Sequence, residues 1–170
     1  MSEAQELEGL LEGIKVETRF ENVVGKAEAF LSKAEGIIKN KSKLRELRGE
    51  EIVAIAEGIG WILSPEGGRR WRDLRNKNQS VPREFKEVKR TQLRKFLDMV
   101  NRLKSQFDLD SAIMLRYRIA YAAGREEGLK VFMKVIEPAL RRVRDEKDFE
   151  RFARLVEAVV AYHAFYGGRD

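Results

Sequence analysis

The sequence predicts an all-α fold, and three observations support this prediction. Apolar residues recur at helical spacing over most of the 170 residues. Few stretches alternate apolar and polar residues as half-buried strands do, and the chain holds only three prolines. A chain of this length buries about 70% of its unfolded surface, enough for one core. We therefore expect a single bundle of about five to seven helices with one long basic loop.

Two helices are expected at the N-terminus. Residues 3–17 place three leucines and one isoleucine at helical spacing, and residues 22–39 carry a longer apolar stripe that Asn22 could cap. Glycines weaken both helices by up to about 1 kcal/mol each relative to alanine, so both helices need packing partners. We treat residues 1–42 as an N-terminal helical extension and residues 43–170 as the main bundle.

A third helix is expected over residues 43–63, ending at the Pro and Gly residues of 64–68. For residues 64–88 the sequence predicts one long irregular basic loop, with a short helical turn around Trp71. A loop of this length in a compact domain is usually functional or disordered. Trp71 lies among the cations of residues 69–77, so it could stack on a base; alternatively, it anchors the loop to the core.

Two helices are expected after the loop. Thr91 has the character of an N-cap for a helix that runs to about Ser105. The next helix should start at residues 108–111 and end with Gly124 as its C-cap. Because the connection 106–110 is short, we expect these two helices to be antiparallel neighbours.

Two further helices complete the expected bundle. One covers residues 126–144 and contains Pro138, which removes a backbone hydrogen bond and should kink or break it. The last covers residues 146–166, with His163 on its apolar side, and ends at Gly167-Gly168.

The charge of the chain is unevenly distributed. The net charge is +6, but residues 64–144 hold 21 Lys or Arg against 10 Asp or Glu, a balance of +11. Residues 1–63 balance to −3 and residues 145–170 to −2. A basic centre between acidic ends predicts a surface that binds a polyanion and is built from the middle of the chain.

Several basic residues are candidates for phosphate contacts. Helix N-termini offer free N–H groups to phosphate, and the Arg fork matches phosphate oxygens. The alternative is that these residues only form solvated helix faces. Arg116 and Arg118 lie about 200° apart on a helix, so they should point in different directions, and we favour Arg118 for the phosphate contact. The candidates are Arg94, Lys95, Arg116, Arg118, Arg125, Arg69 and Arg70.

The sequence gives no sign of a catalytic or metal site. A lone His163 lacks an evident Ser, Cys or carboxylate partner, so we expect it to be a packed, hydrogen-bonded residue. Asp108 and Asp110 lack further ligands at loop spacing, and helix capping by Asp110 explains them. With no cysteine, disulfides and thiolate metal sites are excluded. We expect no cofactor.

The chain shows no membrane or secretion signal. No stretch approaches the ~18 apolar residues that span a membrane, and the acidic start is not a signal peptide. We therefore expect a cytoplasmic protein.

Three segments in order, residues 91–96, 120–125 and 157–168, resemble the small α-helical subunit of type III-A CRISPR effector assemblies, the Csm complex. The resemblance covers roughly residues 44–168; in that family the N-terminal region varies in length, so residues 1–42 fall outside it. It implies a non-catalytic subunit that lies along guide RNA and target RNA. Copies would stack head-to-tail along repeating backbone subunits and contact the large signature subunit, while target cleavage belongs to the backbone subunits.

Some basic residues match the family pattern and one residue departs from it. Arg94, Arg116, Arg118 and Arg125 match basic positions, whereas Tyr117 stands where the pattern often has Pro. Two other classes remain: a small helix-turn-helix DNA-binding regulator whose helix 92–106 reads the major groove, and an enzyme such as an RNase. A preference for one sequence over scrambled ones would indicate the regulator, and turnover with added metal would indicate the enzyme.

Overall fold

The structure is a computed structural model that describes residues 1–16 and 20–167, with the backbone alone at residues 20 and 21. The described residues form eight α-helices and one 3-10 helix, and no strand. The all-α prediction is confirmed, with slightly more helices than expected. The elements are α1 (Glu3–Val16), α2 (Phe20–Lys39), η1 (Leu44–Glu46), α3 (Gly49–Leu63), α4 (Pro65–Asn76), α5 (Arg90–Ser105), α6 (Leu109–Arg125), α7 (Leu129–Leu140) and α8 (Glu146–Phe165).

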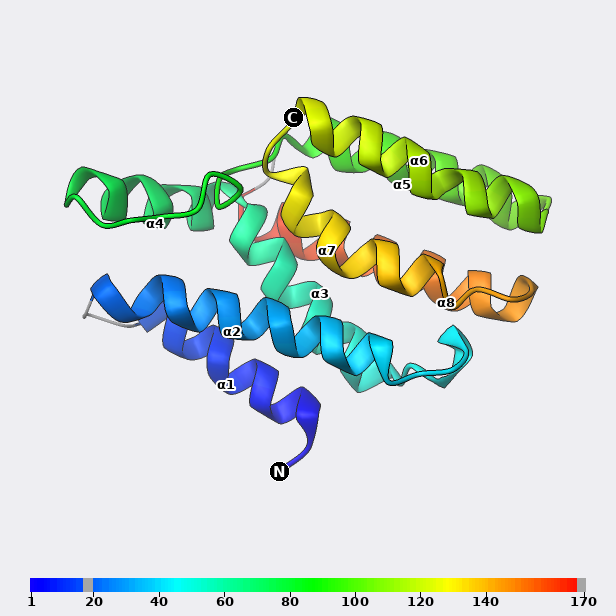
Figure 1. The fold of residues 1–170 in the computed structure, drawn as a ribbon, viewed down its shortest axis with the longest axis horizontal. Coiled ribbons are helices and arrows are strands. Elements are labelled where there is room, and N and C mark those ends of the chain that lie inside the picture. Colours follow the sequence, from blue (N-terminus) through cyan, green and yellow to red (C-terminus); the bar gives the residue numbers. More distant parts are fainter. Residues whose placement is uncertain (17–19, 168–170) are drawn as a thin grey trace.

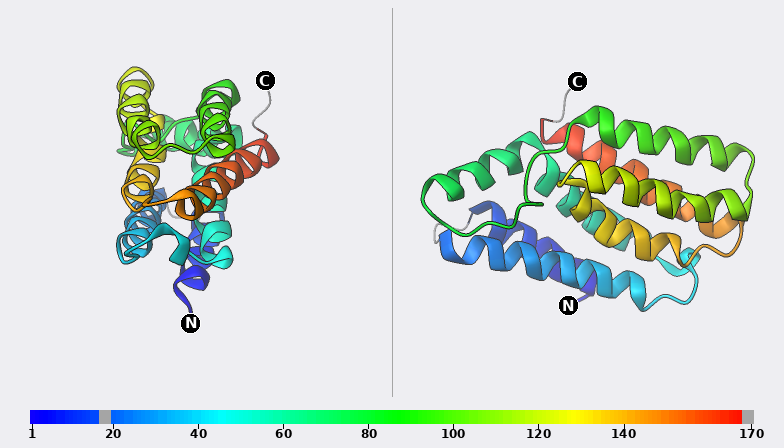
Figure 2. Two further views of the ribbon diagram at one scale, coloured as in Figure 1. Left: turned by 90° about the vertical axis from the view of Figure 1, so that its right-hand side faces the viewer. Right: turned by 45° about the horizontal axis from the view of Figure 1, so that its top comes forward.

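The helices pack in two layers, which Figure 2 shows end-on in its left-hand view. One layer runs α1, α3, α8, α5, and the other runs α2, α7, α6, with each helix in contact with the next. The most extensive contact joins α3 and α8, so this pair forms the centre of the molecule (Figure 1). Residues 1–42 share the same apolar core through α1 and α2, which pack on α3 and α7.

Gly60 allows α3 and α8 to approach closely. A Cβ at this position would lie 2.8 Å from the Tyr162 Cβ and 2.9 Å from the His163 nitrogen. Real Cβ atoms essentially never come this close to another heavy atom, so only glycine fits. Gly58 and Gly60 thus belong to the interior of α3, and the close packing offsets their low helix propensity.

The segment 64–88 differs from the long irregular loop that the sequence predicts. Residues 65–76 form α4, and only the stretch after it is irregular. Ser64 caps α4 by accepting a hydrogen bond from the Gly67 N–H at 3.1 Å, and Pro65 occupies the first turn, where proline is favoured. Gly67 is a close-packing residue and not a helix breaker, because a Cβ there would lie 2.1 Å from the Trp61 carbonyl oxygen.

Trp71 lies on the inner face of α4 and is fully buried. Its Nε1–H donates to the Ile62 carbonyl oxygen at 2.8 Å, and its ring centroid lies 5.7 Å from Trp61 and 5.0 Å from Phe85. The interpretation of Trp71 as a core anchor is confirmed. Base stacking by Trp71 is wrong, because no face of the ring is open.

The expected helix starts need small corrections. The expected helix 43–63 is divided into η1 and α3, α5 starts at Arg90 after Lys89 and not after Thr91, and Asn22 lies inside α2. Asp108, and not Asp110, caps α6 by accepting from the Ser111 N–H at 3.1 Å. The last helix, α8, agrees with expectation and is capped by Asp145.

Two helix ends also differ. Gly124 lies within the last turn of α6, which ends at Arg125 and is followed by Glu126 as C-cap. The helix α7 is shorter than the expected 126–144. It begins at Leu129 and ends at Leu140, two residues after Pro138. No described helix has the combination of length and apolar character that crossing a membrane requires.

Candidate nucleic-acid interface

The helices α5 and α6 form an antiparallel pair on the upper edge of the molecule (Figures 1 and 2). Residues 106–108 connect them, which confirms the predicted short connection. The buried residues of α5, such as Phe96 and Val100, lie on its apolar face, and α5 packs mainly on α8. The helix α6 packs mainly on α7. Because the two helices are held by different neighbours, a groove remains between them.

The α5–α6 groove contains a hollow of about 390 Å³ whose lining includes basic and aromatic side chains among apolar ones. Lys95 lines it from α5, and Tyr117, Arg118 and Tyr121 line it from α6. A second hollow of about 420 Å³ continues along the same seam and shares Arg118. The groove therefore offers cations, whose positive charge suits a phosphate chain, next to open aromatic rings.

The structure separates the two arginines on either side of Tyr117, as the sequence predicts. Arg118 is exposed and lines the groove. Arg116 points toward α7, where its Nε donates to the Glu137 carboxylate at 3.2 Å. Arg116 is therefore paired with a carboxylate of the same chain.

The other candidates of this region lie near the groove. Arg94 and Lys95 are both exposed on the first half of α5. The Arg125 guanidinium lies 5.8 Å from the ring centroid of Tyr121, and its Nη1–H donates to the Tyr121 hydroxyl oxygen at 3.4 Å. Arg125 therefore lies beside Tyr121 at the C-terminal end of α6.

Arg69 and Arg70 lie on α4, away from the α5–α6 groove. The helix α4 projects to the left in Figure 1, whereas the α5–α6 pair extends to the right. Neither arginine lines the groove. The structure thus does not join the α4 cations and the α5–α6 cations into one surface.

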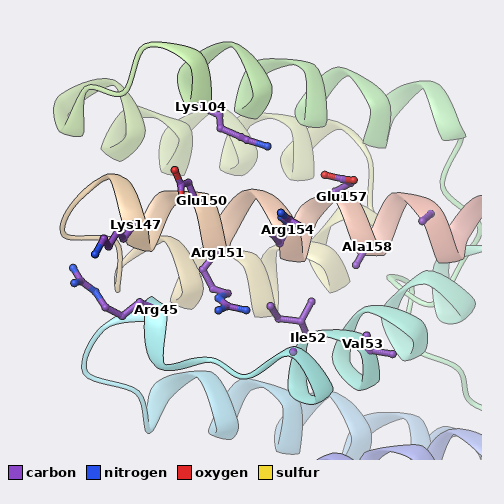
Figure 3. Close-up of a pocket in the computed structure, with 12 residues that line it drawn as sticks. Arg45, Ile52, Val53, Lys104, Lys147, Glu150, Arg151, Arg154, Glu157 and Ala158 are labelled. Atoms are coloured by element: carbon purple, nitrogen blue, oxygen red, sulfur yellow. The ribbon is translucent and has the colours of Figure 1, made fainter.

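A second basic surface lies along α8 and is absent from the sequence-based candidates (Figure 3). It is a groove of about 930 Å³, with α8 as its floor and residues of α3 and α5 at its two sides. Lys147, Arg151 and Arg154 line it, and Lys104 reaches it from α5. None of these four cations lies within ion-pair distance of a carboxylate in the described part of the chain. We call this surface the α8 groove.

In the sequence, the feature that indicates the α8 groove is the helical spacing of its cations. Positions 147, 151 and 154 fall on one face of a helix. The acidic balance of residues 145–170 concealed this face, because Asp145 and Asp148 are used within the fold. Asp145 accepts from the Asp148 N–H at 3.1 Å as the helix cap.

Asp148 is fully buried and ties η1 to the start of α8. It accepts from the Arg45 N–H at 2.9 Å, the Arg45 Nε at 3.0 Å and the Arg144 N–H at 2.9 Å. Burial raises the pKa of this carboxyl, but the Arg45 guanidinium and the two backbone donors outweigh burial and hold the pKa below its ordinary value. Asp148 thereby also holds Arg45 at the end of the α8 groove.

His163 is fully buried, which confirms the prediction of a packed residue. Its Nε2 lies 3.1 Å from the Leu63 carbonyl oxygen and 2.7 Å from the Val88 carbonyl oxygen. Two acceptors at Nε2 require a proton there, so the neutral ring carries its hydrogen on Nε2. Burial lowers the pKa of His163. Among the described residues, no group of three or more His, Asp or Glu side chains is arranged to hold a metal ion.

Comparison with known proteins agrees with the resemblance seen in the sequence. A protein-family model described as Csm2 Type III-A matches residues 69–169. A curated protein of Streptococcus thermophilus, described as CRISPR system Cms protein Csm2, is 35% identical over 89 residues, covering 47% of this chain and 74% of that protein. No solved structure gives a significant match. The family match starts within α4, so α1–α3 lie outside it. The chain therefore belongs to the Csm2 family of type III-A CRISPR systems, the small-subunit family of the Csm complex.

Proposed function

We propose that this chain is a non-catalytic subunit of a type III-A effector complex that binds the backbone of guide or target RNA without sequence specificity. The observation that carries the proposal is the α5–α6 groove, where Lys95 and Arg118 face the same hollow from two helices. In guide-directed complexes base pairing supplies sequence specificity, so a protein subunit needs only to recognise backbone and shape.

The arrangement of α5 and α6 favours this function over the helix-turn-helix alternative. A helix-turn-helix motif crosses its two helices at about 90–120°. The helices α5 and α6 instead run antiparallel, side by side in both views (Figures 1 and 2). The family membership, together with a His163 that is enclosed by backbone carbonyls, also supports a binding role over an RNase.

We expect salt-sensitive RNA binding that depends on Lys95 and Arg118. With about three phosphate contacts to a single strand, the log–log slope of affinity against salt should be roughly −2. The double change Lys95→Ala and Arg118→Ala should flatten the slope to roughly −0.7, because about one contact remains. Fluorescence anisotropy with a labelled RNA over a salt series measures both slopes.

The matched control for this experiment is Lys39→Ala with Lys134→Ala, which removes the same charge from exposed positions on α2 and α7. It should leave the slope unchanged. If the groove variant keeps the parental affinity and slope, the RNA surface lies elsewhere and the α8 groove is the first candidate. A preference of ~10³ for one sequence over scrambles would support the regulator instead.

We also propose that copies of the chain stack along the complex, together with guide RNA and the other subunits. Charge distribution supports this arrangement, because exposed Glu8 and Glu12 lie one turn apart on α1 and are acidic, whereas the α8 groove is basic. Two different patches that complement each other generate a head-to-tail contact, and such a contact can form an open filament.

Charge reversal tests the stacking contact. Arg151→Glu with Arg154→Glu should weaken self-association, because it places like charges opposite one another. Glu8→Arg with Glu12→Arg should weaken it for the same reason. Combining all four changes should restore association. Sedimentation of the full chain with and without RNA gives the oligomer distribution. Failure of the combined variant to recover would show that these two patches do not meet.

A further inference from the structure

The helix α6 exposes a row of large apolar side chains that the packing of this chain leaves uncovered. Leu109, Ile113, Tyr117 and Tyr121 follow one another at four-residue spacing, so they share one face of the helix. Exposure rises along the row, from 37% at Leu109 to 57% at Tyr117 and 64% at Tyr121. The two most exposed members are the aromatic ones.

Cations concentrate at the tyrosine end of this row. Lys95 and Arg118 line the same hollow as Tyr117 and Tyr121. Arg125 lies 5.8 Å from the centre of the Tyr121 ring and donates to its hydroxyl oxygen at 3.4 Å. Open aromatic rings set among cations are the arrangement that single-strand-binding proteins use, with bases on the rings and phosphates on the cations.

We propose that Tyr117 and Tyr121 form a stacking platform for an unpaired RNA base, with the adjoining phosphates held by Lys95, Arg118 and Arg125. This inference rests on the proposed RNA-binding function and names the substrate class of the same site: a nucleotide whose base is not stacked in a duplex. A paired base has both faces covered by its neighbours, so only an unpaired or extruded base can present a face to the rings.

The size and the chemistry of the hollow fit such a nucleotide. Its volume of about 390 Å³ lies within the range of small-molecule sites. Gln92 lies at its edge and offers an amide to the rim of a base. Stacking on tyrosine remains independent of sequence, because every base has a π-face, so the platform is compatible with the lack of sequence preference proposed above.

The test uses 3-fluorotyrosine incorporated into the full chain and ¹⁹F NMR, which detects weak binding. The chain has four tyrosines, and single Tyr→Phe changes assign their signals. The probes are a single-stranded RNA, the same RNA paired with its complement, and an abasic oligonucleotide of equal length. We expect the Tyr117 and Tyr121 signals to shift clearly more with the single strand than with the duplex or the abasic chain, while the half-buried Tyr162 and Tyr166 signals stay in place.

Affinity measurements separate this inference from the proposed function. Tyr121→Ala should weaken single-strand binding roughly fivefold to a hundredfold and leave the salt slope unchanged, whereas Tyr121→Phe should keep near-parental affinity. Arg118→Ala should instead weaken binding to every probe and flatten the slope. Equal ring shifts with the RNA and the abasic chain, or no ring shift while Arg118 still matters, would overturn the platform and leave backbone binding intact.

Two further outcomes also decide the question. If the chain binds no RNA at NMR concentrations, both the platform and the proposed function fail. If the two tyrosine signals shift with protein concentration alone and RNA adds nothing, the α6 row is a protein interface and the inference is wrong.

Discussion

Trp71→Ala is expected to destabilise the protein by about 3–5 kcal/mol, the usual cost of removing a large buried aromatic side chain. The change empties a site between Trp61 and Phe85 and removes the hydrogen bond to the Ile62 carbonyl oxygen. The loss should detach α4 from the end of α3. Urea denaturation followed by circular dichroism measures the change in the free energy of unfolding.

Two further variants serve as controls for Trp71→Ala. Trp71→Phe keeps most of the apolar volume and loses the Nε1 hydrogen bond, so its cost should be smaller. Tyr121→Ala removes an aromatic side chain that is 64% exposed, and it should change the free energy of unfolding by no more than about 0.5 kcal/mol. An unchanged stability in Trp71→Ala would show that α4 is not anchored by this ring.

Asp148→Ala is the second large expected effect, with a loss of about 2–4 kcal/mol, because the N–H groups of Arg45 and Arg144 lose their acceptor. The titration of Asp148 should also make the free energy of unfolding depend on pH. The native pKa of Asp148 is lowered, so its contribution is present above the ordinary value of 3.8 and is lost as the pH falls through the native pKa. Denaturation at a series of pH values measures both effects.

Asp148→Asn is the matched control for this prediction. The amide keeps one acceptor oxygen and the shape of the side chain but cannot titrate. The stability of Asp148→Asn should therefore fall less steeply with decreasing pH than the stability of the parent. A profile for Asp148→Asn that follows the parental one would mean that other carboxylates, such as the buried Glu51, account for the acid sensitivity. Burial raises the pKa of Glu51, but the hydrogen bond from the Arg48 N–H and the bond from Lys41 outweigh it and lower the pKa.

The sequence predicts the class of the fold and most of its helices because apolar periodicity is a local signal. The sequence predicts α8 almost to the residue, because its apolar side is regular and glycines follow it. The helix α4 is predicted only as a short turn around Trp71, because Gly67 and Gly68 usually interrupt helices. Here the glycines serve close packing against Trp61 and Glu87, and that packing depends on residues that only the tertiary structure brings near.

The candidate site was predictable in part for the same reason. The antiparallel α5–α6 pair followed from a short connection, and the divergence of Arg116 and Arg118 followed from helix geometry. The remaining features depend on packing between helices. No local pattern shows that Tyr117 and Tyr121 are uncovered, or that α3 and α5 place Ile52 and Lys104 on either side of α8.

The hydrogen bonds around His163 have a consequence for how this fold tolerates change. The Val88 N–H donates to the Leu63 carbonyl oxygen at 2.9 Å, and the His163 ring bonds the carbonyl groups of both residues. These bonds join residues 63 and 88, the two ends of the segment that carries α4, while the buried Trp71 fixes α4 itself to the core. Insertions at the exposed tip near Asn78, where φ is already positive, would lengthen the α4 arm without changing the register of α5 and α6. The length of that arm and the shape of the α5–α6 groove are thus free to diverge independently.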